Sequence, residues 1–361
     1  MLVLIFERVL YTRQWHKGFT YRANFSASVA TEGHQLQIIE ELENKKFLPL
    51  PWVYTKTQLP SGFIFVDKNS EPISGKSGGI SLFAMMSYTA IRHKRRFICN
   101  KRGFFRFSTT HISISNLFHT KQFAKDIKNL GELIVYPRTL EELEESEFLF
   151  KLLDTTILSN RMINPDPFEF RGIRDYQPTD PLNSINFKAS AVSQSLMVNI
   201  FAPTIGVQLN IILGMDSIAN ITPNYVDVYE NAIRVVSTLA QRYILQDVSV
   251  SFLTNGRNSQ SGKPMRLTAG KSFPHLNKIN ECLALINTVY YTQPLKNELE
   301  LLTDKETFHL IISPAHEAEL IEAVYELNER GLNAFMIVPV FADIPVTLED
   351  SKYVTVWRMQ Q

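Results

Sequence analysis

The stretch 209–256 decides the fold class of the carboxyl-terminal half of the chain. It reads LNIILGMDS (209–217), then YVDVYENAIRVVSTLAQRYIL (225–245), then DVSVSFLTNG (247–256). The first and third segments are apolar runs with few charges, which is typical of strands buried on both faces of a sheet. The middle segment has apolar residues at helical spacing over about five turns. A strand, a helix and a strand in this order predict a parallel sheet with crossover helices.

The same alternation continues to the end of the chain. The pattern is helical at 275–291 and 315–331 and strand-like at 307–314, 333–341 and 353–359. Gly331 ends the second of these helical segments, where glycine is a natural helix terminator. We therefore predict a doubly wound α/β domain over residues 165–361.

The amino-terminal half has a different periodicity. From Tyr21 to Pro137, short segments alternate apolar and polar residues and are interrupted by turn residues. This pattern predicts an antiparallel β-sandwich over residues 18–137. The segment 138–164 carries five glutamates between Glu141 and Glu147, and Thr139 can act as an N-cap, so we predict a linker helix there. The whole chain is thus expected to be a two-domain α+β protein.

Composition excludes several classes of function. The 361 residues carry 37 basic and 36 acidic side chains, a net charge of +1, which gives no long-range field to attract nucleic acid. Two cysteines, Cys99 and Cys282, are too few for a disulfide framework or a Cys-x-x-Cys metal site. No phosphate-binding loop or nucleophile-elbow motif is present. We expect no cofactor, no nucleic-acid partner and no enzymatic activity.

The amino-terminal segment, residues 1–17, begins with an apolar run. The run extends only from Met1 to Phe6 before Glu7 and Arg8 interrupt it. A membrane-spanning helix needs about 20 apolar residues, and the core of a signal peptide needs about 7–15. Two interpretations stay open, namely a hydrophobic turn that packs on the sandwich and the trailing end of a membrane helix.

Asp216 follows the first predicted strand of the α/β domain, at the edge of the sheet where such folds bind ligands. Asp216 and Ser217 in this place resemble the start of the metal-ion-dependent adhesion site of von Willebrand factor A domains. That site needs two further serine positions, which hold Ile218 and Asn220 here, and a second acid, where Pro314 follows Ser313. Thr254 and Thr268 are candidates for its threonine. We expect a degenerate site that holds no metal, and the alternative is a metal-dependent binder or hydrolase.

Seven cations lie from Arg92 to Arg106 without an acid among them, and four phenylalanines, Phe97, Phe104, Phe105 and Phe107, interleave with them. Cationic grooves with aromatic side chains bind single-stranded nucleic acid, which is one interpretation. We favour the other, a two-stranded hairpin that turns at 101–103, because alternation of core aromatics with exposed cations already explains the spacing.

The segment FEFRGIRDYQPTDPLNSINFKASA (168–191) is too charged for a core strand. Two prolines, Pro178 and Pro181, predict a turn around Asp180. We expect the arms 168–176 and 185–191 to pair as a hairpin. In that hairpin Arg174 would lie close to Asp180, and Lys188 or Arg171 would meet Asp175.

This segment also resembles the signature of the family called domain of unknown function 58 (DUF 58). The matching positions are Gly172, Arg174, Tyr176, Pro178, Asp180, Ile185, Ser190 and Ala191. The sequence departs from the signature at Thr179, Asn183, Phe187 and Val192. Upstream, the segments 30–52, 101–118 and 132–138 are similar to the sandwich of the family in the same order. The resemblance covers the chain from about Trp15 to its end.

The resemblance implies a sandwich domain followed by a degenerate von Willebrand factor A-like domain that carries the signature hairpin at 168–192. Most members of the family begin with a pair of membrane helices and lie at the cytoplasmic face of the cell membrane. Their genes often neighbour those of MoxR-type AAA+ ATPases. The implied function is that of a non-enzymatic assembly or regulatory protein, with the signature residues and Lys188 as a partner-docking surface. Membrane association would require a missing or separate amino-terminal anchor.

Overall fold

The computed structural model describes residues 2–57, 62–66, 79–107, 109–140, 165–177, 180, 182–203, 208–216, 225–291, 293–341 and 350–359. The predicted linker helix, from residue 141 onward, lies outside the described residues, as do Pro178, Ser217 and Asn220. The chain divides into two compact units, residues 1–138 with 283–285 and residues 139–282 with 286–361. Among the described residues, no helix is long and apolar enough to cross a membrane.

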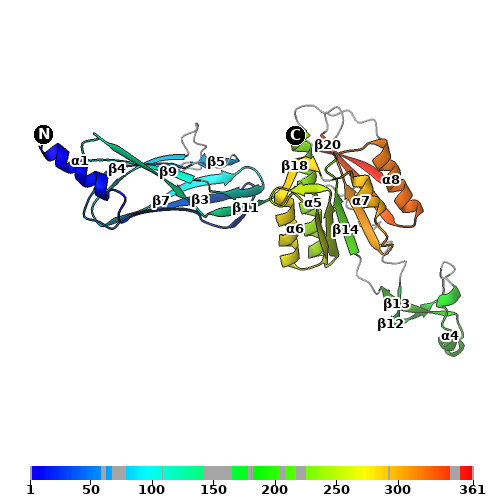
Figure 1. Ribbon diagram of the computed structural model, residues 1–361. Coiled ribbons are helices and arrows are strands. Elements are labelled where there is room, and N and C mark those ends of the chain that lie inside the picture. Colours follow the sequence, from blue (N-terminus) through cyan, green and yellow to red (C-terminus); the bar gives the residue numbers. More distant parts are fainter. Residues whose placement is uncertain are drawn as a thin grey trace. The chain divides into compact units, whose positions relative to one another are not determined.

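The amino-terminal unit is a β-sandwich preceded by one helix (Figure 1). Its sheets have the strand orders β1-β3-β7-β5, β10-β9-β4-β6 and β2-β11-β8. The elements are α1 (Leu2–Gln14), β1 (Phe19–Phe25), β2 (Val29–Thr31), β3 (Gln35–Asn44), β4 (Leu50–Thr57), β5 (Phe63–Val66), β6 (Ile80–Met85), β7 (Thr89–Cys99), β8 (Gly103–Arg106), β9 (Thr109–Ser115), β10 (Gln122–Lys128) and β11 (Glu132–Tyr136).

Two apolar clusters form the core of the sandwich. One joins the two four-stranded sheets through residues such as Tyr21, Leu42, Val53 and Ile114. The other joins the first sheet to the three-stranded sheet through residues such as Phe97 and Leu133. Because alternate residues of each strand face these clusters, the period-two pattern of the sequence follows directly from burial.

The carboxyl-terminal unit contains a six-stranded sheet of order β17-β15-β14-β19-β20-β21. All neighbours are parallel except β17, which pairs antiparallel with β15. The elements are β14 (Gln208–Leu213), α5 (Tyr225–Leu245), β15 (Ser249–Thr254), β16 (Gly256–Asn258), β17 (Met265–Gly270), α6 (Phe273–Leu285), β18 (Ile286–Tyr291), α7 (Leu295–Glu300), β19 (Thr307–Ile312), α8 (Ala318–Glu329), β20 (Asn333–Phe341) and β21 (Val354–Met359).

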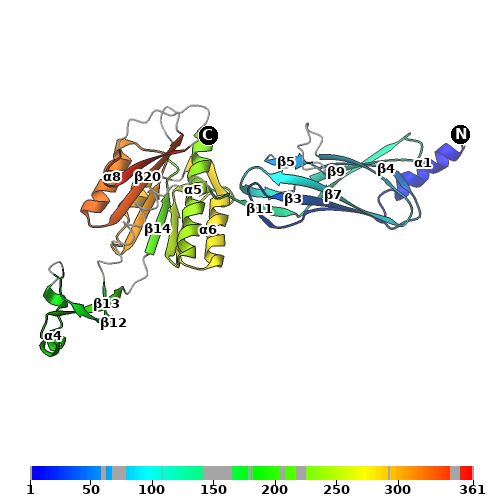
Figure 2. The ribbon, with the colours of Figure 1, turned by 180° about the vertical axis from the view of Figure 1, so that it is seen from behind.

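Helices cover both faces of this sheet (Figure 2). The helices α7 and α8 pack on the face that carries Ile212 and Ile311. The helix α5 contacts β14, β15 and β20 from the opposite face. A β-sheet unit followed by an α/β unit agrees with the fold class predicted from the sequence.

One predicted helix is shorter than expected. The helix predicted over 275–291 ends at Leu285, and Ile286–Tyr291 continue as β18, which pairs antiparallel with β16. The reason lies in composition, since Ile286, Thr288 and Val289 are β-branched and two tyrosines follow them. Such residues favour an extended strand over the end of a helix.

The segment that contains the signature residues forms a lobe of its own, residues 165–203. Its strand β12 (Pro165–Asp175) pairs antiparallel with β13 (Met197–Pro203). The predicted second arm, 185–191, is therefore wrong, because Phe187–Ser193 form the helix α4, which follows the short turn η2 (Leu182–Ser184). Asn186 caps α4 by accepting the backbone N–H of Ala189 at 2.9 Å. This local cap stabilises a helix where the apolar-polar alternation had indicated a strand.

The basic hairpin predicted over Arg92–Arg106 is also wrong. The strand β7 pairs with β3 and β5, whereas β8 pairs with β11 in another sheet. The register explains the choice of partner, because Glu40 and Glu41 of β3 lie opposite His93 and Arg92 of β7. Cross-strand pairs of opposite charge stabilise this pairing.

Candidate functional site

The carboxyl ends of β14, β15 and β19 lie side by side at the point where the strand order reverses. In open α/β sheets, ligands bind in the crevice at this switch point. The described residues that follow these strands include Gly214, Met215 and Asp216 after β14, Asn255 after β15 and Ser313 after β19. This edge of the sheet is therefore the first candidate for a site.

The carboxylate of Asp216 is bound by groups of the protein itself. Its Oδ1 accepts a hydrogen bond from the side-chain amide of Asn255 at 2.7 Å. The backbone N–H of Leu295 donates to Oδ1 and Oδ2 at 3.1 and 3.0 Å. Leu295 is the first residue of α7, where backbone N–H groups have no partner within the helix. Asp216 thus satisfies a donor at the start of α7.

Asn255, which contacts the carboxylate of Asp216, is itself fixed by hydrogen bonds to two other loops. Its side-chain oxygen accepts the backbone N–H of Met215 at 2.8 Å, and its amide also donates to the carbonyl of Gln293 at 2.9 Å. Asn255 is fully buried. The three loops after β14, β15 and β18 are consequently joined through this one amide.

Burial raises the pKa of the Asp216 carboxyl, and the charge of Glu317 adds to that rise. The hydrogen bonds from Leu295 and Asn255 act in the opposite direction and favour the ionised form. The fixed dipoles of Leu295 and Asn255 thus offset part of the cost that burial imposes on the ionised carboxylate.

The hydroxyl of Ser313, beside the position expected for the second acid, and that of the candidate Thr254 are engaged within their own loops. Ser313 Oγ donates to the carbonyl of Ala315 at 3.1 Å, and Thr254 Oγ1 accepts the backbone N–H of Gly256 at 2.9 Å. Thr268 lies exposed on the edge strand β17. Within the part of the chain that the structure describes, no three His, Cys, Asp or Glu side chains form a group that could hold a metal.

The second candidate is the lobe 165–203, where the structure confirms the predicted pairing of Arg174 with Asp180. The two terminal nitrogens of Arg174 donate to the two carboxylate oxygens of Asp180, each at 2.6 Å. Asp180 also accepts the backbone N–H of Gln177 at 2.8 Å. Arg174, then Gln177, lowers the pKa of Asp180. Such a bidentate pair fixes the geometry of the turn.

The other signature residues have structural partners or face solvent. The backbone N–H of Tyr176 donates to the carbonyl of Leu196 at 2.8 Å, and Ser190 Oγ donates to the carbonyl of Asn186 at 2.7 Å. Lys188 is exposed and does not meet Asp175, which instead accepts a 3.4 Å hydrogen bond from Ser195. Of the two partners predicted for Asp175, Lys188 is therefore excluded, and the side chain of the other, Arg171, lies outside the described residues.

The lobe exposes apolar side chains that the sequence pattern did not single out. Val192, Phe187, Leu182 and Leu196 are 85, 75, 73 and 51% exposed. Two of these residues, Phe187 and Val192, occupy positions where the sequence departs from the DUF 58 signature. The lobe therefore carries both exposed apolar side chains and a fixed ion pair.

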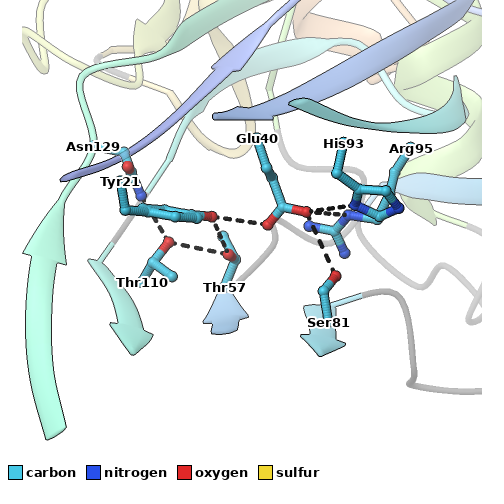
Figure 3. A network of polar contacts seen from close by, with 8 residues as sticks. All are labelled: Tyr21, Glu40, Thr57, Ser81, His93, Arg95, Thr110 and Asn129. Atoms are coloured by element: carbon cyan, nitrogen blue, oxygen red, sulfur yellow. Dashed lines mark hydrogen bonds and ion pairs between the residues drawn. The ribbon is translucent and has the colours of Figure 1, made fainter. Parts of the chain in front are cut away.

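A buried polar network in the sandwich is the feature that sequence reasoning missed (Figure 3). Glu40 has no exposed surface, and its Oε1 accepts the hydroxyl of Tyr21 at 2.8 Å. Its Oε2 lies 3.1 Å from His93 Nδ1 and 3.3 Å from Arg95 Nε. Burial, and then the negative charge of Glu40, raises the pKa of Tyr21.

The network crosses the core from one sheet to the other. The hydroxyl of Tyr21 lies 3.3 Å from that of Thr57, which lies 3.0 Å from that of Thr110. Asn129 donates to Thr110 at 2.8 Å. Tyr21 and Glu40 belong to the first sheet, and Thr57 and Thr110 to the second. A usable signal was present in the sequence, since an acid on the inward-facing side of β3 requires a buried cation nearby.

Acids compensate part of the basic segment. Arg92 lies 3.2 Å from Glu41, and Arg106 donates to Glu132 at 2.9 and 2.5 Å and lies over the ring of Phe104. These ion pairs reduce the positive charge that a nucleic acid would meet.

Comparison with known proteins does not assign the chain to a family. No family model and no curated protein matches it. Among solved structures, a non-cellulosomal cohesin from Archaeoglobus fulgidus is 12% identical, with 36% of this chain and 99% of that chain covered, at a TM-score of 0.22. An α2-macroglobulin from Escherichia coli is 10% identical over 33% of this chain and 7% of that chain, at a TM-score of 0.22.

An alkylpurine DNA glycosylase from Pseudomonas fluorescens is 9% identical, with 31% of this chain and 30% of that chain covered, at a TM-score of 0.18. The chain thus spans less than a third of the length of that glycosylase and of the macroglobulin. Similarity at this level carries no argument about activity.

Proposed function

We propose that this chain is a non-enzymatic interaction protein of the DUF 58 type that works with a MoxR-type AAA+ ATPase in assembly or regulation at the cytoplasmic face of the cell membrane. The observation that carries the proposal is the state of Asp216. Its carboxylate accepts hydrogen bonds from Leu295 and Asn255, which supports a structural role for the acid at the switch point of the sheet.

The strand order supports the assignment of the α/β unit to the von Willebrand factor A type. Numbered along the chain, the six strands have the order 3-2-1-4-5-6, which is a doubly wound order with its switch point between β14 and β19. Asp216 then occupies the place of the first metal ligand, while Ser313 and Thr254 bind their own loops. This is the arrangement expected of a degenerate metal site.

The lobe 165–203 is the proposed docking surface for the ATPase. The Arg174–Asp180 pair holds the turn beside Gln177, and α4 presents Phe187 and Val192 to solvent. Burying exposed apolar side chains is the main source of affinity in most protein interfaces, and fixed polar groups set their orientation. Both features lie within the lobe 165–203.

The test uses the full chain immobilised on a sensor and the purified MoxR-type ATPase of the same organism. We expect binding that falls at least tenfold in the double variant Phe187→Ser, Val192→Ser and falls measurably in Arg174→Ala. The matched control is the double variant Phe273→Ser, Leu301→Ser, whose side chains are 66 and 67% exposed in the same unit. Absence of binding by the unaltered chain, or equal losses in both double variants, would refute the proposed docking surface.

A further inference from the structure

Four segments of the amino-terminal unit meet at the end of the sandwich where α1 lies (Figures 1 and 2). They are α1 with the residues that follow it (2–18), the β3–β4 loop (45–49), the β6–β7 turn (86–88) and the β9–β10 turn (116–121). We call this surface the α1 end.

Hydrogen bonds join α1 to two of the other segments. Glu7 accepts the side-chain amide of Asn116 at 2.6 Å and the backbone N–H of Leu117 at 2.8 Å. The hydroxyl of Tyr11 donates to the carbonyl of Pro49 at 2.7 Å. Glu7 and Tyr11 are four residues apart, so one face of α1 is held against the sandwich.

The β6–β7 turn is attached to the β3–β4 loop. The backbone N–H of Tyr88 donates to the carbonyl of Lys46 at 3.2 Å, and Asn44 donates to the carbonyl of Met86 at 2.9 Å. Lys46 Nζ in turn donates to the carbonyl of Gln14 in α1 at 2.9 Å. The α1 end is therefore one connected surface.

Large apolar side chains project into solvent from all four segments. Phe47, Phe6 and Tyr88 are 79, 71 and 71% exposed, and Ile5, Phe118 and Val9 are 52, 50 and 47% exposed. At 3.6 residues per turn, Ile5, Phe6 and Val9 fall within an arc of about 100°, on the side of α1 away from Glu7 and Tyr11. Helix and loop tips thus expose aromatic and aliphatic groups together.

The charge of the α1 end differs from that of the whole chain. The four segments contain six cations, Arg8, Arg13, Lys17, Lys45, Lys46 and Lys121, and one acid, Glu7. Glu7 is occupied by the β9–β10 turn, whereas Arg8, Arg13 and Lys17 are exposed. Lys45 has a neighbour in β3, Glu43 at 3.1 Å. A net excess of five cations therefore gathers here in a chain whose total charge is +1.

We propose that the α1 end binds the surface of a lipid bilayer that contains anionic phospholipids. Aromatic and aliphatic side chains on a helix and on loop tips enter the boundary between headgroups and acyl chains, while flanking lysines and arginines attract the anionic headgroups. A protein partner fits this composition less well, because lysine is depleted in protein interfaces. The inference does not depend on the lobe 165–203, so it stands or falls separately from the proposed ATPase docking.

The experiment is co-sedimentation of the full chain with vesicles of phosphatidylcholine alone and of phosphatidylcholine with 30% phosphatidylserine. We expect binding to the anionic vesicles that weakens in 0.5 M salt, because salt screens the attraction. The double variant Phe47→Ser, Phe118→Ser should lower the partition coefficient about tenfold or more. The double variant Arg13→Gln, Lys17→Gln should lower it about 25-fold, at about fivefold per cation.

Matched controls lie toward the other end of β10. Leu130 is 90% exposed, and Leu130→Ser should leave vesicle binding unchanged, because its position lies about 20 Å along the strand from the β9–β10 turn. Lys125→Gln with Lys128→Gln removes the same charge as the cation variant and should also have little effect.

Two results would overturn the proposal. One is the absence of binding to anionic vesicles at low salt, and the other is equal binding by the unaltered chain and by Phe47→Ser, Phe118→Ser. Sedimentation velocity without lipid tests whether the α1 end binds a second copy of the chain instead. A dimer that this double variant dissociates, combined with no vesicle binding, would assign the α1 end to a second copy of the chain.

Discussion

Both carboxylate oxygens of Asp216 accept the backbone N–H of Leu295, at 3.1 and 3.0 Å, across 79 residues of sequence. The acid at the carboxyl end of β14 is thereby joined to the first residue of α7. Asp216 accepts a hydrogen bond from an N–H group that has no partner within the helix. Such groups at a helix start favour a negative charge nearby. This contact gives Asp216 a structural role, which the following substitutions test.

Asp216→Ala should destabilise the α/β unit by about 1–3 kcal/mol, because buried donors of Leu295 and Asn255 lose their acceptor. Asp216→Asn should cost less than about 1 kcal/mol, since one amide oxygen can accept from both. Hydrogen exchange of the amides of β14 measures the opening of this unit separately from the sandwich. An Asp216→Ala protein with unchanged protection would contradict the structural role.

The stability of the unaltered chain should depend on pH differently from that of Asp216→Asn. Burial raises the folded-state pKa of Asp216 above its ordinary 3.8. The folded state then binds more protons than the unfolded state between the two pKa values, so stability falls as pH rises through that window. The free energy of unfolding of the unaltered chain, relative to that of Asp216→Asn, should be highest at acidic pH. It should fall as the Asp216 carboxyl ionises. Denaturant titrations of both proteins at several pH values test this sign.

Titration of the full chain with Mg²⁺ or Mn²⁺ in a calorimeter should give no tight, stoichiometric heat. A hard divalent cation needs several free oxygen ligands, and the carboxylate of Asp216 is already bound by protein donors. A tight heat abolished by Asp216→Ala, yet preserved in the exposed control Asp227→Ala, would favour the metal-dependent binder or hydrolase instead.

Glu40→Ala should destabilise the sandwich by about 3–5 kcal/mol, because it leaves the nearly buried guanidinium of Arg95 without its counter-charge. Tyr21→Phe removes only one donor to Glu40 and should cost about 1 kcal/mol. The adjacent acid provides the control, since Glu41 is 49% exposed and pairs with Arg92. Glu41→Ala should cost no more than about 1 kcal/mol, and equal losses at both positions would show that burial of Glu40 is unimportant.

Lys46 should make the stability of the chain change with pH in the alkaline range. Burial lowers the pKa of Lys46 from 10.5 to about 8. Between these values the unfolded chain binds more protons, so stability rises with pH from about 8 to 10.5. Lys46→Met lacks the titration, and its stability relative to the unaltered chain should therefore fall over that range. Denaturant titrations of both proteins at pH 7.5 and pH 10 give the comparison, and a parallel pair of curves would refute it.

The Arg174–Asp180 pair should behave as one unit in a double-mutant cycle. Arg174→Ala, Asp180→Ala and the double variant should expose the amide of Gln177 to hydrogen exchange to the same extent, because Asp180 is the acceptor of that amide. Arg174 lowers the pKa of Asp180, so the turn should be stable above the ordinary carboxyl pKa and loosen as pH falls through the lowered value. Additive effects of the two substitutions would mean that they act independently.

The order of apolar segments in the sequence was sufficient to predict the two kinds of unit. Period-two alternation before Pro137 and strand–helix alternation after Gln208 both follow from which side chains each element buries. The spacing of apolar residues within each short segment shows this burial. The closeness of Arg174 and Asp180 was also predictable, because only six residues and a turn separate them. The local cap at Asn186, which makes Phe187–Ser193 a helix, was the local signal that the alternation obscured.

Tertiary structure alone decided the pairing of elements far apart in the chain. The local cap at Asn186 removes 185–191 as a strand, but only the fold brings β13 to β12, and only the fold pairs β7 with β3 instead of β8. The burial of Glu40 depends on Tyr21, His93 and Arg95, which three different strand positions bring to it. Asp216 could be placed at a strand end from sequence, but whether its carboxylate faces a ligand or a helix depends on where α7 begins in space. Strand pairing and the surroundings of Glu40 and Asp216 depend on the packing of whole sheets. A short segment of sequence does not determine that packing.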